Sequence, residues 1–399
     1  MTKSPQDKRL SYALVLGSLA ALGPLCIDLY LPALPEMAKE LHTSTATSQL
    51  SLTAGLLGLG FGQIIFGPLS DSLGRMRPLL FSLVILLLAS LGCAFAQNID
   101  QLIVARLIQG LAGAGGAVIS RAIARDMYTG HALTKFFALL MLVNGLAPIV
   151  APVLGGGLLT IVSWRGIFAT LAIIAVLLFL FSAGKLQETL PEERRLQGGA
   201  KTMVISLWTL LHHRQFMGLC LTQGFVMAGM FAYIGASPFV LQQIYHLSAQ
   251  EFSFCFAVNG IGLVIAAQIS SRLSALWGEM AMVKVGLGIA AVACVILVIV
   301  ATLQAPLFTV LIPLFFSVFA IGIISPNSAS LAMQSQGKSA GSASALLGVA
   351  MFALGAISVP ITGIGGTSAL SMGLTIMGCY ALAIIMFATL VRRTPKPVQ

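Results

Sequence analysis

The chain has 399 residues, of which 58% are hydrophobic and only 9% are charged, against roughly 25% charged residues in ordinary soluble domains. This composition, with a mean hydropathy of +0.98, excludes a soluble domain and predicts an integral membrane protein. Strict alternation of polar and apolar residues is absent, so we expect helices and not a β-barrel. The net charge of +10 lies in short connectors, which argues against nucleic acid as a partner.

The apolar runs predict twelve membrane-spanning helices, and an even number places both termini on one side. Nineteen of the 22 Lys and Arg residues lie in connectors on that side, against two on the other, so the positive-inside rule predicts cytoplasmic termini. The predicted spans are 11–34, 48–69, 78–97, 101–121, 135–158, 166–186, 215–241, 250–271, 281–302, 306–328, 341–363 and 368–391.

The longest polar connector separates six spans from six. We therefore expect an all-α fold with an N-terminal six-helix bundle over 1–186, a cytoplasmic linker over 187–213 and a C-terminal six-helix bundle over 214–399. Residues 202–211 in the linker could form an amphipathic helix at the membrane surface. Two joined, pseudo-symmetric bundles are what a secondary transporter requires, although many unrelated membrane proteins also have twelve spans.

One acid, Asp28, lies within the first apolar run, whereas the other eleven acids lie at or beyond the ends of such runs. A charge at this depth costs about 2.5–3.5 kcal/mol on insertion scales, and such residues usually face a cavity, a partner charge or an ion path. Arg106 lies inside the fourth span at the same depth of about 10 Å, counted at 1.5 Å per residue from the outer ends. A direct or water-mediated pair between them is therefore expected.

Histidine and cysteine give no sign of a metal site. All five histidines lie in connectors, and the six cysteines lie in apolar runs without Cys-x-x-Cys spacing. We expect no metal, cofactor or disulfide. The chain also lacks the H-E-x-x-H, G-x-S-x-G and P-loop motifs, which argues against a membrane enzyme and against ATP as the energy source.

The connector after the second span resembles the loop signature of the major facilitator superfamily, with Ser72 and Met76 departing from the usual bases. The superfamily uses this loop as a conformational latch, which by resemblance comprises Gly67, Asp71, Gly74, Arg75, Arg77 and Asp126. Arg106-Leu107-Ile108-Gln109-Gly110 is similar to its R-x-x-Q-G motif. The counterpart loop of the second half, 271–278, lacks the acid, so a second latch is not expected.

The fifth span resembles the antiporter motif of drug/proton exporters at Gly145, Pro148, Pro152, Gly155 and Gly156. Together with 28–35, 121–128, 163–168, 188–191 and 229–239, these motifs resemble the bicyclomycin-resistance (Bcr/CflA) family of drug exporters. The resemblance implies export of bicyclomycin, amphenicol or sulfonamide-type compounds across the bacterial inner membrane, by a monomer that contacts lipid.

These features lead to the hypothesis of proton-driven export by alternating access. Burial favours the neutral form of Asp28 and a nearby Arg106 the charged form, so movement of water or of Arg106 can switch its proton occupancy. The alternative is that the two residues form a fixed structural pair. Sodium coupling stays open, although one isolated carboxylate is a poor site for a hard cation.

The predicted cargo pocket lies between the halves, where a few amides and several adaptable apolar side chains would contact the ligand. A strongly anionic cargo would lack a basic cluster. A metabolite or amino-acid exporter with the same proton site and a proton symporter for uptake are alternatives. The candidate substrate residues are Tyr30, Met141, Asn144, Phe231, Tyr233, Asn259, Gln268, Asn327 and Phe352.

Overall fold

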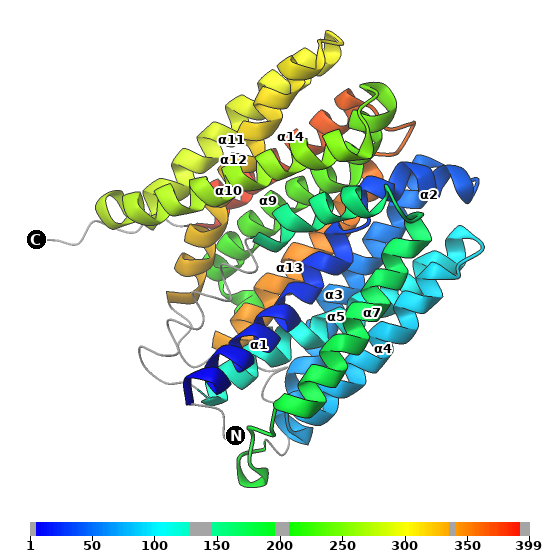
Figure 1. Cartoon of the computed structure of the whole chain (residues 1–399). Coiled ribbons are helices and arrows are strands. Elements are labelled where there is room, and N and C mark those ends of the chain that lie inside the picture. The colour runs from blue at the N-terminus through cyan, green and yellow to red at the C-terminus, as the bar shows by residue number, and fades with distance from the viewer. Residues whose placement is uncertain (1–4, 128–145, 196–206, 335–339, 392–399) are drawn as a thin grey trace, which may run out of the picture. The chain divides into compact units, whose positions relative to one another are not determined.

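A computed structural model describes residues 5–127, 146–195, 207–334 and 340–391 (Figure 1). The described residues form helices, short connectors and turns, and none of them forms a strand. The chain divides into two compact units. The first comprises Met1–Gly199 with Ser237–Gly260, and the second comprises Ala200–Ala236 with Ile261–Gln399.

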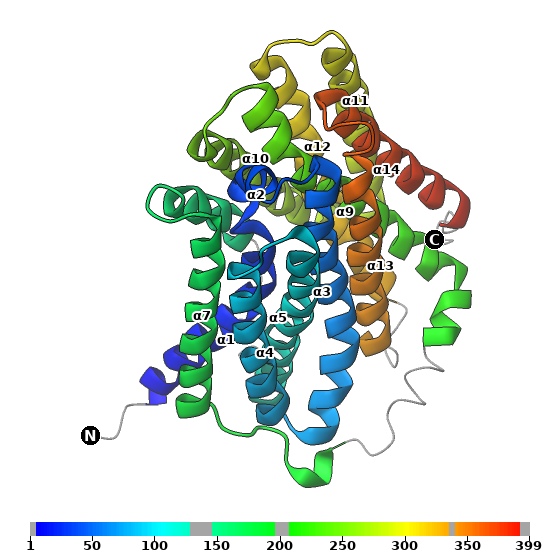
Figure 2. The ribbon, with the colours of Figure 1, turned by 90° about the vertical axis from the view of Figure 1, so that its right-hand side faces the viewer.

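The first unit is built on long helices that pack side by side (Figure 2). The centre of the bundle is apolar, with buried residues from α1, α3, α4, α5 and α7. Its helices are α1 (Pro5–Asp28), α2 (Leu34–Glu40), α3 (Thr45–Leu73), α4 (Met76–Ala94), α5 (Ile99–Met127), the helix Leu146–Leu158 and α7 (Trp164–Lys185).

A change of helix type follows Asp28 directly. The α-helix α1 ends at that residue, and a short 3-10 helix, Leu31–Ala33, leads into α2. Pro32 lies at the start of the 3-10 helix and Pro35 at the start of α2, where a missing backbone N–H breaks no helical hydrogen bond. The acid therefore lies at a break in the backbone ladder and not in the middle of a continuous span.

The second unit contains α9 (Arg214–Phe239) up to Ala236, α10 (Ala249–Trp277) from Ile261, and four further helices. The π-helical turn Val240–Ile244 and the start of α10 belong to the first unit. The further helices are α11 (Glu279–Thr302), α12 (Leu307–Gln334), α13 (Ala340–Ile361) and α14 (Ala369–Leu390).

The structure confirms the all-helical membrane fold. Eleven helices among the described residues are long and apolar enough to cross a membrane, and the predicted span 135–158 is described only as the shorter helix Leu146–Leu158. Several helices extend past the predicted spans: α5 continues to Met127 and α12 to Gln334, where their last turns become polar. The predicted linker helix is described from residue 207, and residues 207–212 are helical.

Candidate functional site

Arg106 is fully buried in α5 and is held by two acceptors on different elements. Its Nη1 donates to the carbonyl oxygen of Cys26 at 2.7 Å and also donates to Oε1 of Gln109. Gln109 in turn donates from Nε2 to Oγ of Ser90 at 2.8 Å. The guanidinium therefore links α5 to α1 directly and to α4 through the amide of Gln109.

Two aromatic rings cover the guanidinium. The Arg106 Cζ lies 4.2 Å from the ring centroid of Tyr30 and 5.7 Å from that of Phe168. The two ring centroids are 5.4 Å apart, and the Tyr30 hydroxyl lies 3.3 Å from Oγ of Ser51. Cation–π contact with a desolvated ring contributes about 2 kcal/mol, which helps a buried charge to persist.

Glycines allow α3 and α5 to approach closely at this level. A Cβ on Gly55 would lie 2.9 Å from Nη2 of Arg106, and a Cβ on Gly110 would clash with the Gly55 carbonyl oxygen. The R-x-x-Q-G pattern therefore has a physical reading here: Arg106 is the cation, Gln109 its acceptor, and Gly110 the point of helix contact.

Asp28 lies next to this cluster, but the direct ion pair is not formed within the described part of the chain. The side chain is 4% exposed, and its Oδ1 has no hydrogen-bond partner there. The Arg106 atoms Nε and Nη2 likewise have none. These two atoms form the edge of a guanidinium that a carboxylate can bind in a bidentate manner. A water-mediated pair and the coupling role stay predictions.

One antiporter-motif glycine, Gly155, packs against the residue that follows Asp28, and another, Gly156, packs against the start of α10. A Cβ on Gly155 would clash with the carbonyl oxygen of Leu29. The carbonyl oxygen of Gly156 accepts a hydrogen bond of 3.0 Å from Nε2 of Gln250, and a Cβ on Gly156 would clash with Ser253. The helix Leu146–Leu158 thus contacts both the end of α1 and the start of α10 through small residues.

Other residues of the motif have less specific surroundings. Pro152 is buried and Pro148 is half-buried. Gly145 lies outside the described residues.

Three of the predicted latch residues, Asp71, Arg75 and Asp126, contact one another at the other end of α3. Arg75 donates from Nε to Asp126 at 2.8 Å and from Nη1 to Asp71 at 2.5 Å, and Nη1 also reaches Oγ of Ser70 at 3.0 Å. The Arg75 side chain is only 7% exposed. One guanidinium therefore joins the ends of α3 and α5 at the start of α4.

Glu188 contacts Arg75 and Met76, although the motif comparison did not include it among the latch residues. Its carboxylate accepts from the backbone N–H groups of Arg75 at 2.9 Å and Met76 at 3.1 Å, at the N-terminus of α4. Burial alone would raise the pKa of Glu188, but hydrogen bonds from backbone N–H groups, that of Arg75 foremost, lower it below its ordinary value. The neighbouring Thr189 donates to Asp126 at 3.1 Å.

The remaining latch residues differ in their contacts. Gly74 has φ +89°, and a Cβ there would lie 2.6 Å from Oε2 of Glu188, so both conformation and space require glycine. The Gly67 carbonyl accepts from Ser70 at 2.8 Å. Arg77 is exposed, and no salt bridge to it occurs within residues 5–127, 146–195, 207–334 and 340–391.

The predicted substrate residues are placed in different environments. Tyr30 covers Arg106. In the second unit the rings of Phe231 and Phe352 lie 5.9 Å apart, and Asn327 donates to Ser270 at 2.6 Å, which ties α12 to α10. Tyr233 and Asn259 are buried, Gln268 is exposed, and Met141 and Asn144 lie outside the described residues.

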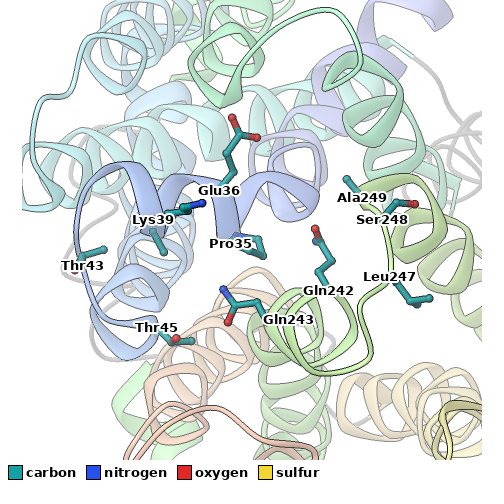
Figure 3. Close-up of a pocket in the computed structure, with 11 residues that line it drawn as sticks. Pro35, Glu36, Lys39, Thr43, Thr45, Gln242, Gln243, Leu247, Ser248 and Ala249 are labelled. Carbon is teal, nitrogen blue, oxygen red and sulfur yellow. The ribbon is translucent and has the colours of Figure 1, made fainter.

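A cavity of about 560 Å³ opens in the first unit at the N-terminal end of α3, opposite the latch (Figure 3). Beside it, Gln242 in the π-helical turn donates from Nε2 to the Pro32 carbonyl at 3.0 Å. No predicted substrate residue lines this cavity. Seven of its eleven lining residues have polar side chains: the lining is Pro35, Glu36, Ala38, Lys39, Thr43, Thr45, Gln242, Gln243, Leu247, Ser248 and Ala249.

A group of contacts near the same end, here called the staple, joins the end of α2, the start of α7 and the connector after α4. Trp164 donates from Nε1 to Glu40 at 2.6 Å, and Arg165 pairs with the same carboxylate. Arg165 also donates to the Ala96 carbonyl at 2.8 Å, and its Cζ lies 4.1 Å from the Trp164 ring centroid. In the sequence, Trp164 and Arg165 belong only to the family-like stretch 163–168, and Glu40 was not predicted as their partner.

Comparison with known proteins decides the family. The family model of the Major Facilitator Superfamily matches residues 16–360. The chain belongs to this superfamily. It is a multi-pass membrane transporter and not an enzyme, as the motifs predicted.

Relatives and solved structures agree with this assignment. The chain is 44% identical over 376 residues to the uncharacterized MFS-type transporter YdgK of Bacillus subtilis, with 94% of each chain covered. It is 28% identical over 392 residues to a bicyclomycin resistance protein homolog of Haemophilus influenzae, with 98% of each covered. The crystal structure of a D-xylose-proton symporter shares the fold, with a TM-score of 0.74 at 15% identity over 96% of this chain and 98% of that chain.

Proposed function

We propose that the chain exports antibiotics and related drugs across the bacterial inner membrane in exchange for protons, by alternating access, with both termini in the cytoplasm. The drug-resistance relatives and the antiporter-motif packing at Leu29 support export. The cargo is a neutral or weakly charged, moderately apolar compound of the bicyclomycin, amphenicol or sulfonamide type. The transporter works as a monomer of two six-helix bundles, 1–186 and 214–399, joined by the linker 187–213.

The observation that carries the proposal is the unused hydrogen-bonding capacity of Asp28 and Arg106. A buried carboxylate oxygen without a partner is costly, and Oδ1 of Asp28 has none within the described residues, so we assign a protonated Asp28 to this conformation as part of the proposal. Loss of that proton would create a carboxylate next to an Arg106 edge, Nε and Nη2, that has no partner within the described chain. Binding at that edge would turn the guanidinium toward Asp28, and Nη1 would leave its acceptors Cys26 and Gln109.

This exchange of partners would move the backbone at the site of transport. Arg106 holds α1 through the carbonyl of Cys26, two residues before the α-helix ends. Release of that carbonyl would free the break between α1 and the 3-10 helix, and Gly155 contacts the Leu29 carbonyl at the same break. Proton loss on one side of the membrane would thereby be linked to a shift of α1 against the fifth span.

The test is drug transport by the purified chain in proteoliposomes with an imposed pH gradient, comparing the native protein with Asp28→Asn. We expect the gradient to drive accumulation in the native protein and Asp28→Asn to abolish the drive while downhill drug movement persists. The matched control is Asp100→Asn, an exposed acid in the first turn of α5. Accumulation by Asp28→Asn against a drug gradient would overturn the assignment of Asp28.

The same experiment distinguishes a drug substrate from the alternative, a metabolite or an amino acid. If the native chain dissipates no pH gradient with any of the drug classes but does so with amino acids or other metabolites, the coupling proposal stands with a metabolite as substrate. Replacing the proton gradient by a sodium gradient tests the ion. Coupled movement of drug and proton in the same direction would contradict export.

A further inference from the structure

Glu279 makes a contact in the second unit that the sequence did not predict. It is the first residue of α11 and follows Gly278, which has φ +80°. Its Oε1 accepts from Oγ of Ser330 at 2.6 Å, and its Oε2 accepts from Nε2 of Gln334 at 2.5 Å. Both donors lie in the last turns of α12, so the two oxygens of one carboxylate join the start of α11 to the end of α12.

This contact occupies the same place in its repeat as the Arg75 latch does in the first. Gly278 follows Gly74 by 204 positions, and the same interval leads from Arg75 to Glu279 and from Asp126 to Ser330. The two glycines have φ values of +89° and +80°. The helices that precede them, α3 and α10, each have 29 residues and begin and end at the same interval.

The polarity of the contact is reversed. In the first unit a cation at the start of α4 meets the carboxylate of Asp126. In the second unit an anion at the start of α11 meets a hydroxyl and an amide. A carboxylate in the first turn of a helix is favoured by the helix dipole, whereas Arg75 at the N-cap is not and needs Glu188 beside it.

We propose that Glu279 is a positioning residue that holds the ends of α11 and α12 together, as a latch of opposite polarity to that of Arg75. Hydrogen bonds to a charged acceptor are stronger than neutral ones, so two of them make a substantial clamp between helix ends. The clamp needs both helix ends in register and is lost when they separate. The proposal depends on the repeat and on these contacts, and not on the cargo or the coupling ion.

The contacts around Glu279 join separate helices, so its role is not limited to capping α11. One turn before Ser330, Asn327 donates to Ser270 on α10, so the same stripe of α12 bonds both neighbours. Deeper in the unit, Met282 of α11 packs with Ala266 and Ile323 in an apolar cluster. The polar end contacts therefore close a three-helix group whose apolar part is already packed.

The experiment measures amide hydrogen exchange of the purified full chain in detergent, in peptides from the first turns of α11 and the last turns of α12. With Glu279→Ala we expect exchange to be about tenfold faster in both peptides, as the loss of charge-assisted bonds implies. A residue that only caps α11 would change the α11 peptide alone. Asp100→Ala, a first-turn acid of α5 in the other unit, is the control and should change neither peptide.

A charge swap distinguishes loss of this contact from a general loss of folding. Glu279→Arg together with Ser330→Asp recreates the polarity of Arg75 and Asp126, and we expect it to slow exchange in both peptides relative to Ser330→Asp alone. Ser330→Asp alone places two carboxylates together and should be the most perturbed variant. Faster exchange confined to α11, or no recovery in the double variant while its unfolding temperature is native, would overturn the proposal.

Discussion

Arg106 donates a hydrogen bond from Nη1 to the Cys26 carbonyl oxygen at 2.7 Å, and not to the Asp28 carboxylate two residues further along. The buried cation is thus satisfied by a backbone carbonyl, an amide and two aromatic faces. This leaves one edge of the guanidinium unused within the described chain. A fixed structural pair would have consumed that edge.

Arg106→Lys should strongly slow active transport although the charge is kept. A lysine ammonium could still donate to Cys26 and Gln109, because both accept from the single atom Nη1. It lacks the Nε–Nη2 edge proposed to receive Asp28 and the planar face that lies over Tyr30. We expect a drop in the transport rate of about 10–100-fold, as the loss of a hydrogen bond to a charged group implies. Initial rates in proteoliposomes measure it. Arg77→Lys, on an exposed latch residue, should transport at the native rate; equal rates for both variants would contradict this role of the guanidinium.

Gly155→Ala should stop transport while Gly157→Ala should not. A methyl group at Gly155 would collide with the Leu29 carbonyl oxygen, whereas no atom lies within 4 Å of the corresponding position at Gly157. The two variants differ by two residues on the same helix, so helix propensity is matched. Transport rate and unfolding temperature should be measured together. Native transport by Gly155→Ala would show that this contact does not matter for the cycle.

The sequence predicted the helices and the contacts among Asp71, Arg75 and Asp126 because both depend on local signals. Apolar runs identify spans whatever they pack against, and Asp71, Arg75 and Asp126 belong to an ordered motif. Partner choice within the membrane depends on side-chain direction and on which carbonyls a helix break exposes. Depth counting therefore brought Arg106 and Asp28 to the same level but could not show that the carbonyl of Cys26 is the nearer acceptor.

Two further omissions have the same cause. Glu188 and Glu279 are ordinary acids near helix ends in the sequence, and their roles depend on which distant helix end they meet. The departure of the second loop from the motif suggested that no latch exists there. The exact interval of 204 positions was present in the sequence and could have directed attention to Glu279.

Glu40→Ala should destabilise the first unit by about 1–2 kcal/mol. The Glu40 carboxylate accepts from the buried Trp164 indole and pairs with Arg165, so its removal leaves a buried N–H group without an acceptor. Thermal unfolding in detergent measures the loss. Glu36→Ala is the matched control on the same helix, since that side chain is exposed at the cavity. A smaller loss in Glu40→Ala than in the control would mean that the staple contributes nothing.

Glu188 should make the stability of the first unit depend on pH in acid. Because its pKa is lowered in the folded state, its contribution is fully present above its ordinary value of 4.5 and is lost as the pH falls through the folded pKa. Glu188→Gln should lower the unfolding temperature at pH 7. The loss in the free energy of unfolding should be under about 1 kcal/mol, because the group is largely exposed. The difference from the native chain should shrink below pH 4. Glu192→Gln, whose carboxylate side chain is 85% exposed, should show no such dependence, and a constant difference for Glu188→Gln down to pH 3 would contradict the role of its charge in capping α4.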